Sequence, residues 1–209
     1  RSGDIVLDDT NLYIGEAYSG NRNFDGLIDD VRIYNYARTQ KQILEDMNGG
    51  GPASKMPVLH LSFDEGRGET VHDSSIYGNN GTANVGTGGS QTATSSMWEK
   101  SGKVKGAMEF DGTDDYVNIA GGAGSAWDIA GEEVTVAAWV TTGSSAGGSG
   151  DRIVAKSSSD ASDDYGIQAP YGGMYRFRIR TSGGLGEINS PMSKYPYDDT
   201  WHYVVGIYD

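Results

Sequence analysis

The sequence predicts an all-β fold, an antiparallel two-sheet sandwich with one short helix. Short runs of alternating apolar and polar residues recur about every 8–15 residues, with turn-forming residues between them. No regular alternation of strands with helices, the pattern of a parallel sheet, runs along the chain. The 13 Tyr and 4 Trp supply apolar area that offsets a hydrophobic content of 36%, so a folded chain is expected rather than a disordered one.

Charge and cysteine content narrow the classes of partner. The net charge of −13 repels phosphate backbones, so nucleic acid is not expected as a partner. The chain contains no Cys, which excludes a disulfide framework and thiolate chemistry. No apolar run approaches the roughly 18 residues of a membrane-spanning helix, so membrane insertion is not expected. The chain starts at Arg1 without a signal-like segment, as an internal piece of a larger protein would.

The first part of the chain predicts short strands at residues 4–7 and 12–15 and a longer strand at residues 27–34. Because side chains alternate along a strand, Leu27, Asp29, Val31 and Ile33 should share one face. Three of these four are apolar, so Asp29 is expected to point inward. A buried carboxylate needs hydrogen-bond donors or a metal ion.

One helix is expected, directly after this strand. Thr39 has the chemistry of a helix N-cap, and Gln42 follows three residues later, as in a capping box. Residues 48–51 (NGGG) carry the Asn and Gly typical of a helix C-terminus. Residues 49–57 then form a predicted Gly/Pro linker.

A second section of the chain supplies the other strands. Strand patterns occur at residues 58–66, 107–119, 134–142, 152–157, 164–169, 174–181 and 201–209. Polar or Gly-rich loops separate them. The spacing supports the antiparallel sandwich.

These segments resemble a known domain family in an unusual order. The stretches "LHLSFDEGRGETVHDSSIYGNNGT", "GKVKGAMEFDGTDDYVNI", "EVTVAAWVTT", "IVAK" and "TWHYVVGIYD" occur in residues 58–209. In that order they resemble the first three quarters of a laminin-G-like jelly-roll domain of the concanavalin A-like lectin/glucanase superfamily. Residues 1–48, with "LYIG" and "FDGLIDDVRIYNYART", resemble the last quarter of the same domain.

Two architectures follow from this order. The chain could hold two incomplete domains, each with exposed sheet edges. Alternatively, residues 1–48 pack on residues 58–209 and complete one circularly permuted jelly roll, within one chain or by segment exchange in a homodimer. The second architecture is favoured, because the two segments together supply nearly one full set of strands. Val31 and Ile33 should then bury against the strand that begins at Val58.

The resemblance also implies a structural Ca²⁺ ion near the junction of the first and last strands. The matching residues are Asp29, Asp73, Asn79 and Asn80, whose oxygens are of the kind that Ca²⁺ prefers. The alternative is that Asp73 forms an Asx-turn and Asp29 accepts backbone N–H groups. The string "DGTDD" at residues 111–115 lacks the spacing and the terminal Glu of an EF-hand.

Five aromatic residues lie in loop-like surroundings and could stack on sugar rings. They are Trp98, Trp127, Tyr171, Tyr195 and Tyr197. The alternative is that these rings seal the ends of the sandwich.

The sequence predicts no enzyme. Glucanases of this fold carry paired carboxylates on one strand as E-x-D-x-E, and this string is absent. The expected function is a non-catalytic extracellular binding module for carbohydrate or glycoprotein within a larger multidomain protein, the extracellular location being implied by the resemblance. The alternatives are a structural or adhesive spacer repeat without its own ligand, and a polysaccharide hydrolase or lyase.

Overall fold

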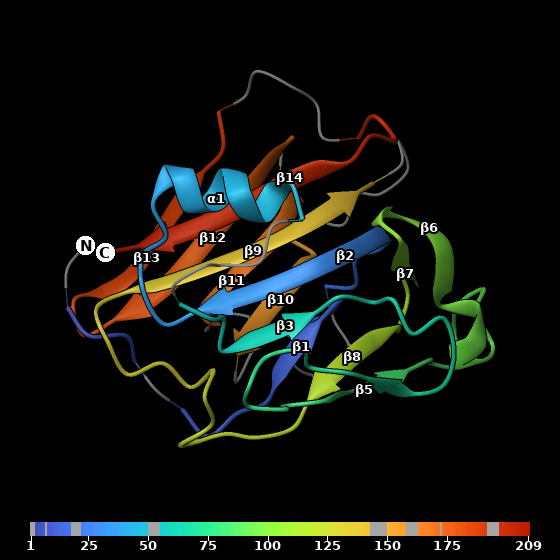
Figure 1. The fold of residues 1–209 in the computed structure, drawn as a ribbon, viewed down its shortest axis with the longest axis horizontal. Helices are drawn as coiled ribbons and strands as arrows, with labels where there is room; N and C mark the ends of the chain where they lie inside the picture. Colours follow the sequence, from blue (N-terminus) through green and yellow to red (C-terminus); the bar gives the residue numbers. More distant parts are fainter. Residues whose placement is uncertain are drawn as a thin grey trace.

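A computed structural model shows the fold of the chain (Figure 1). It describes residues 3–6, 8–17, 22–49, 55–142, 150–157, 163–171, 173–191 and 197–209; the side chains of Asp163, Pro170 and Tyr171 are outside the description. Two antiparallel sheets form a sandwich, which confirms the predicted fold class. Within the described ranges, no helix has the length and apolar character to cross a membrane.

The larger sheet has eight strands in the order β13-β12-β11-β10-β1-β8-β5-β4. These strands are β1 (Leu12–Ile14), β4 (Thr70–Val71), β5 (Gly81–Asn84), β8 (Tyr116–Ile119), β10 (Arg152–Ser157), β11 (Asp163–Tyr171), β12 (Met174–Thr181) and β13 (Gly184–Asn189).

The smaller sheet has the order β14-β9-β2-β7-β6, with β3 beside β2. Its strands are β2 (Asp25–Tyr34), β3 (Leu59–Leu61), β6 (Trp98–Val104), β7 (Gly106–Asp111), β9 (Val134–Thr141) and β14 (His202–Tyr208). One turn of 3₁₀-helix, Thr94–Ser96, precedes β6.

Strand β2 pairs with three other strands. One edge pairs with β9, and the other edge pairs first with β7 and then with β3. Val31 lies opposite Leu61 and Ile33 lies opposite Leu59, and all four side chains are fully buried. The expectation that Val31 and Ile33 bury against the strand after the linker is therefore confirmed, within one chain.

A β-bulge changes the facing of β2. The register with β9 shifts between Asp29 and Arg32, and Asp30 has a positive φ of 51°. Ile28 therefore joins Val31 and Ile33 in the core between the sheets. Asp29 lies opposite Trp139, which is outside this core. The prediction that Asp29 points inward with Val31 and Ile33 is wrong, because the bulge adds a residue that a strict two-residue alternation cannot include.

The helix α1 (Gln40–Met47) begins with the predicted capping box. The Thr39 side chain accepts the Gln42 N–H, and the Gln42 side chain accepts the Thr39 N–H. Figure 1 shows α1 in front of β14, and Asp46 of α1 pairs with Arg32 of β2.

The two ends of the described chain lie side by side (Figure 1). The Tyr208 hydroxyl donates a 2.7 Å hydrogen bond to the Gly3 carbonyl. Ile5 forms an isolated bridge with Thr181 at the end of β12. The start of the chain is therefore anchored beside β12 and β14.

Candidate functional site

The Asp73 carboxylate organises its own loop. Its Oδ1 accepts the His60 and Ser75 N–H groups, both at 2.9 Å. Its Oδ2 accepts the Ser75 hydroxyl at 2.7 Å and the Asn79 N–H at 2.8 Å. The Asp73 N–H donates to Asn80 Oδ1 at 2.9 Å. A carboxylate has about four lone-pair sites, and these four donors occupy them, so Asp73 does not fit the role of a cation ligand in this arrangement.

Asp29 lies apart from this loop, beneath the β6–β7 hairpin. Its Oδ2 accepts the Val104 N–H at 2.7 Å, and its Oδ1 is buried without a hydrogen-bond partner in the described chain. Burial raises the pKa of the Asp29 carboxyl to about 7, although the Val104 hydrogen bond lowers it. The structure thus brings Asp73, Asn79 and Asn80 into one loop, while Asp29 is held by β6.

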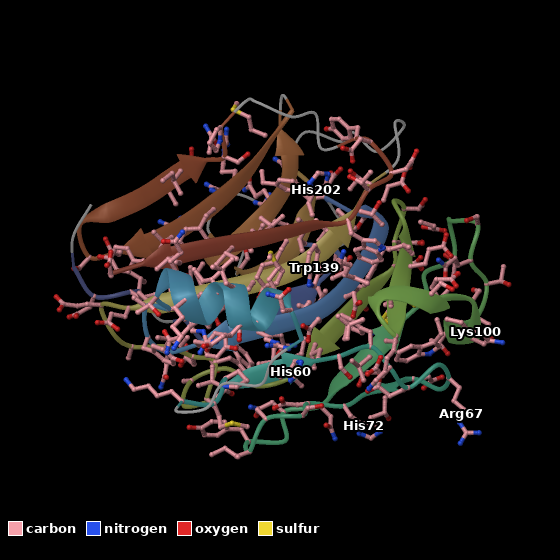
Figure 2. The ribbon with its side chains drawn as sticks, turned by 45° about the horizontal axis from the view of Figure 1, so that its top comes forward. His60, Arg67, His72, Lys100, Trp139 and His202 are labelled. Carbon is pink, nitrogen blue, oxygen red and sulfur yellow. The ribbon has the colours of Figure 1, made fainter. Side chains whose placement is uncertain are left out.

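The neighbouring Asp30 is the residue of β2 that reaches the strand before the Asp73 loop. Asp30 Oδ1 lies 2.6 Å from His60 Nε2, and Asp30 Oδ2 lies 2.9 Å from the Arg32 guanidinium. Arg32 also pairs with Asp46 of α1 at 3.1 Å, and Arg38 pairs with the same carboxylate. This buried ion network fixes α1 on the smaller sheet. Figure 2 labels His60 and Trp139, which lie near α1 in that view.

Two of the five aromatic candidates are core residues. Trp127 is 0% exposed, and Trp98 is 8% exposed with its Nε1–H bonded to the Gly68 carbonyl at 2.9 Å. Both belong to the main hydrophobic cluster. The expectation that they lie in exposed loops is wrong, because Trp98 begins β6 and the sandwich closes over Trp127. Neither ring can stack on a sugar in this structure.

The other three candidates are tyrosines. Tyr197 is partly exposed and lies near Asp151, whose charge adds to the effect of burial and raises the pKa of the Tyr197 hydroxyl. The backbone of Tyr171 closes β11, and its side chain is outside the description. Tyr195 falls outside the described residues altogether.

Another set of aromatic and amide side chains faces outward from the larger sheet. Tyr13 and Tyr116 are partly exposed, and their rings meet edge to face at 6.1 Å. Asn118 lies opposite Tyr13 on one side and opposite Thr82 on the other. Its Oδ1 is buried and has no hydrogen-bond partner among the residues described, whereas the residue as a whole is partly exposed. We call Tyr13, Tyr116, Asn118 and Thr82 the aromatic patch.

The three carboxylates of the DGTDD string at residues 111–115 converge between β7 and β8. One oxygen each from Asp111, Asp114 and Asp115 lies within 4.8 Å of the others. We call these three residues the acidic turn. The sequence contains three Asp within five residues, but their spacing alone does not show that their oxygens converge.

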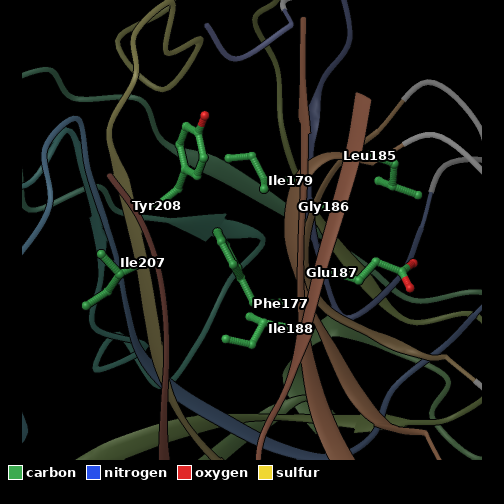
Figure 3. Close-up of a pocket in the computed structure, with 8 residues that line it drawn as sticks. All are labelled: Phe177, Ile179, Leu185, Gly186, Glu187, Ile188, Ile207 and Tyr208. Carbon is green, nitrogen blue, oxygen red and sulfur yellow. The ribbon is translucent and has the colours of Figure 1, made fainter. Parts of the chain in front are cut away.

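An apolar groove opens at the other end of the sandwich, between β12, β13 and β14 (Figure 3). Its volume is about 750 Å³. The residues that line it are Phe177, Ile179, Leu185, Gly186, Glu187, Ile188, Ile207 and Tyr208. The Glu187 carboxylate pairs with the Arg178 guanidinium at 2.9 Å.

A family model described as the concanavalin A-like lectin/glucanases superfamily, of the laminin G type, matches the chain. The match covers residues 2–44 and residues 111–209, more than half of the chain. The chain belongs to this family. The resemblance inferred from its strand motifs is thereby confirmed.

Family membership supports a lectin-like binding module, within a superfamily that also includes glycosidases. No curated protein and no solved structure matches the chain. The family match includes the aromatic residues Tyr13 and Tyr116 and the acidic turn. Asp73, Asn79, Asn80 and Trp98 fall between the two matched segments.

Proposed function

We propose that the chain is a non-catalytic carbohydrate-recognition module of a larger extracellular protein, and that its ligand face is the aromatic patch. The observation that carries the proposal is the partly exposed Tyr13–Tyr116 ring pair, which lies beside the partly exposed Asn118. Aromatic rings bind the C–H faces of sugars, and amide and hydroxyl groups bind their hydroxyls.

The backbone geometry supports this assignment. Leu12, Ile14, Val117 and Ile119 point into the core, so the residues that alternate with them point out. These are Tyr13 on β1 and Tyr116 and Asn118 on β8. Rigid strands therefore hold the Tyr13 and Tyr116 rings in place before a ligand arrives. Such preorganisation reduces the entropy lost on binding.

The groove supports a non-catalytic role. Glycoside hydrolysis uses two carboxyl groups across the scissile bond. Among the eight described residues that line the groove, Glu187 is the one carboxylate, and it is paired with Arg178. Its other lining side chains are mainly apolar, which does not match the hydroxyl-rich surface of a sugar.

A glycan array followed by isothermal titration with the best ligand tests the proposal. We expect Tyr13→Ala and Asn118→Ala each to weaken sugar binding at least about tenfold, which corresponds to about 1.4 kcal/mol. Tyr77→Ala is the matched control, because Tyr77 is 51% exposed and lies in a turn outside the aromatic patch. Its affinity should equal that of the unmodified chain.

Two outcomes would contradict carbohydrate recognition at this face. One is no binding across broad glycan classes, which would favour the spacer repeat without its own ligand. The other is binding that Tyr13→Ala and Asn118→Ala leave unchanged. Circular dichroism of each variant is the check that its fold is retained.

A further inference from the structure

The acidic turn has the dimensions of a calcium site. One oxygen from each of Asp111, Asp114 and Asp115 lies within 4.8 Å of the others. Ca²⁺ binds oxygens at about 2.3–2.6 Å, so two of its ligand oxygens can be at most about 5 Å apart. The spacing of the Asp114 and Asp115 oxygens therefore allows a single ion to contact both side chains.

Hydrogen bonds occupy the whole Asp111 carboxylate, because its Oδ2 accepts the Ser90 N–H, the Ser90 hydroxyl and the Gln91 N–H and its Oδ1 accepts the Thr113 N–H. Asp114 and Asp115 keep unused oxygens. Asp114 Oδ2 accepts two backbone N–H groups, from Thr87 and Gly88, both at 2.8 Å. Asp115 Oδ2 accepts the Asp111 N–H at 3.1 Å. Asp114 Oδ1 and Asp115 Oδ1 are buried, and neither has a hydrogen-bond partner in the described part of the chain. Asp115 is 1% exposed, so bulk water does not compensate its charge.

Two residues near the beginning of the chain, Glu16 and Asn23, also carry buried side-chain oxygens without a hydrogen-bond partner in the described structure. Glu16 is 3% exposed, and its buried Oε2 finds no partner among the residues that the structure describes. Glu16 follows Gly15, whose carbonyl accepts the Phe24 N–H, and the Phe24 carbonyl in turn accepts the Gly112 N–H of the turn between β7 and β8. Asn23 donates from Nδ2 to the Thr113 carbonyl, and its Oδ1 is likewise buried and unbonded within the described ranges.

The backbone connects these segments. The hydrogen bond from Phe24 to Gly15 spans 2.8 Å, and the hydrogen bond from Gly112 to Phe24 spans 3.1 Å. Three segments far apart in the sequence thus place buried, unpartnered oxygens at one end of the sandwich.

We propose that Asp114, Asp115 and Glu16, with Asn23, form a Ca²⁺-binding site. The donors are all carboxylate and amide oxygens, which suit Ca²⁺, whereas Zn²⁺ favours nitrogen and sulfur ligands. Mg²⁺ requires a near-ideal octahedron at about 2.0–2.1 Å, which side chains from three segments seldom supply. The site does not depend on carbohydrate binding and differs from the Asp73 loop that the family resemblance indicates.

Terbium luminescence provides a direct test, because Tb³⁺ occupies Ca²⁺ sites and a nearby tyrosine sensitises its emission. Tyr116 follows Asp115 directly, and the charge of Glu16 contributes to the raised pKa of its hydroxyl. We expect saturable Tb³⁺ emission that Ca²⁺ displaces and equimolar Mg²⁺ does not. Tyr116→Phe should lower the emission without abolishing the Ca²⁺-dependent rise in Tm.

Substitutions of the proposed ligands test whether the ion binds at these residues. Asp115→Asn should weaken Ca²⁺ binding at least about tenfold and remove the rise in Tm between EDTA and about 10 mM Ca²⁺. Because Asp115→Asn also alters a hydrogen bond to the Asp111 N–H, Glu16→Gln serves as a second variant with the same expected loss. Asp4→Asn, at an exposed acid elsewhere, should bind Ca²⁺ like the unmodified chain.

The proposal is overturned by three results. The first is the absence of both Tb³⁺ emission and a Ca²⁺-dependent Tm shift. The second is equal Ca²⁺ affinity of Glu16→Gln and Asp4→Asn. The third is a Ca²⁺-dependent Tm shift that Asp73→Asn abolishes and Glu16→Gln retains. The last result would place the ion in the Asp73 loop.

Discussion

Asp46 of α1 and Arg32 of β2 form an ion pair of 3.1 Å, and both side chains are at most 5% exposed. The same carboxylate pairs with Arg38, and the Tyr34 hydroxyl donates to it at 3.2 Å. One acid therefore connects the helix to the closing strand of the sandwich. Removing one partner from a buried ion pair leaves the remaining charge uncompensated.

We therefore expect Asp46→Asn to lower the free energy of unfolding by about 3–5 kcal/mol. Urea denaturation measures this change. Glu45→Gln in the same helix is the control, because the Lys41–Glu45 pair spans 3.7 Å between exposed side chains and should contribute less than about 0.5 kcal/mol. A loss below 1 kcal/mol on Asp46→Asn would mean that the network does not hold α1.

A second prediction concerns the pH dependence of stability. Lys156 is fully buried and pairs with Asp8, Asp128 and Asp164. Burial raises the pKa of Asp164 to about 7, although Lys156 lowers it. Between about pH 4 and pH 7 the folded state therefore binds a proton that the unfolded state has released, and stability falls as the pH rises through this window.

Asp164→Asn removes this titration. The stability of the unmodified chain relative to Asp164→Asn should decrease by up to about 4 kcal/mol between pH 4 and pH 8. Urea denaturation at several pH values measures the difference, with Glu45→Gln again as the surface control. A difference that stays constant with pH would refute the assignment.

A third prediction separates the Asp73 loop from the acidic turn. Asp73→Ala removes a carboxylate that accepts four hydrogen bonds, and we expect a loss of about 2–4 kcal/mol in unfolding free energy. This loss should be the same in EDTA and in Ca²⁺, since no lone pair of Asp73 is left for an ion. Asp64→Ala, at an exposed acid nearby, should have a much smaller effect. A loss confined to Ca²⁺-containing buffer would identify Asp73 as a ligand.

A fourth prediction tests the proposal that residues 1–48 and 58–209 form one domain. We would introduce a protease site in the linker at residues 49–57 and cleave the folded chain. Because β2 pairs with β3, β7 and β9, both fragments should elute together at the mass of one chain and separate only in urea. Elution at twice this mass would indicate segment exchange, and separation in native buffer would contradict the domain.

Local patterns predicted much of the fold. The alternation in residues 27–34 and the Thr39–Gln42 spacing identified the closing strand and the helix start. Both depend on residues close in sequence, and the structure confirms both. The burial of Val31 and Ile33 against the strand after the linker followed from the order of the family-like segments, whereas the pairing of Val31 with Leu61 is known from the structure alone.

The sites were harder to predict, because they depend on contacts between distant segments. The bulge at Asp30 places Asp29 on the opposite face of β2 from Val31 and Ile33. A regular two-residue alternation cannot predict such a bulge. Trp98 and Trp127 have loop-like neighbours in sequence, yet the packing of the two sheets buries them. Glu16 reaches the acidic turn from about 95 residues away, a separation at which sequence patterns carry little information.

The pairing of β2 also has a consequence for the order of folding. Its partner β9 begins at Val134, about 100 residues after Tyr34, so synthesis at about 5–20 residues per second leaves β2 without β9 for about 5–20 s. During this time the edge of β2 that later pairs with β9 is available to other chains. Asp29, Asp30 and Arg32 place three charges on this nascent strand, which disfavours its association with a second copy until β9 emerges from the ribosome.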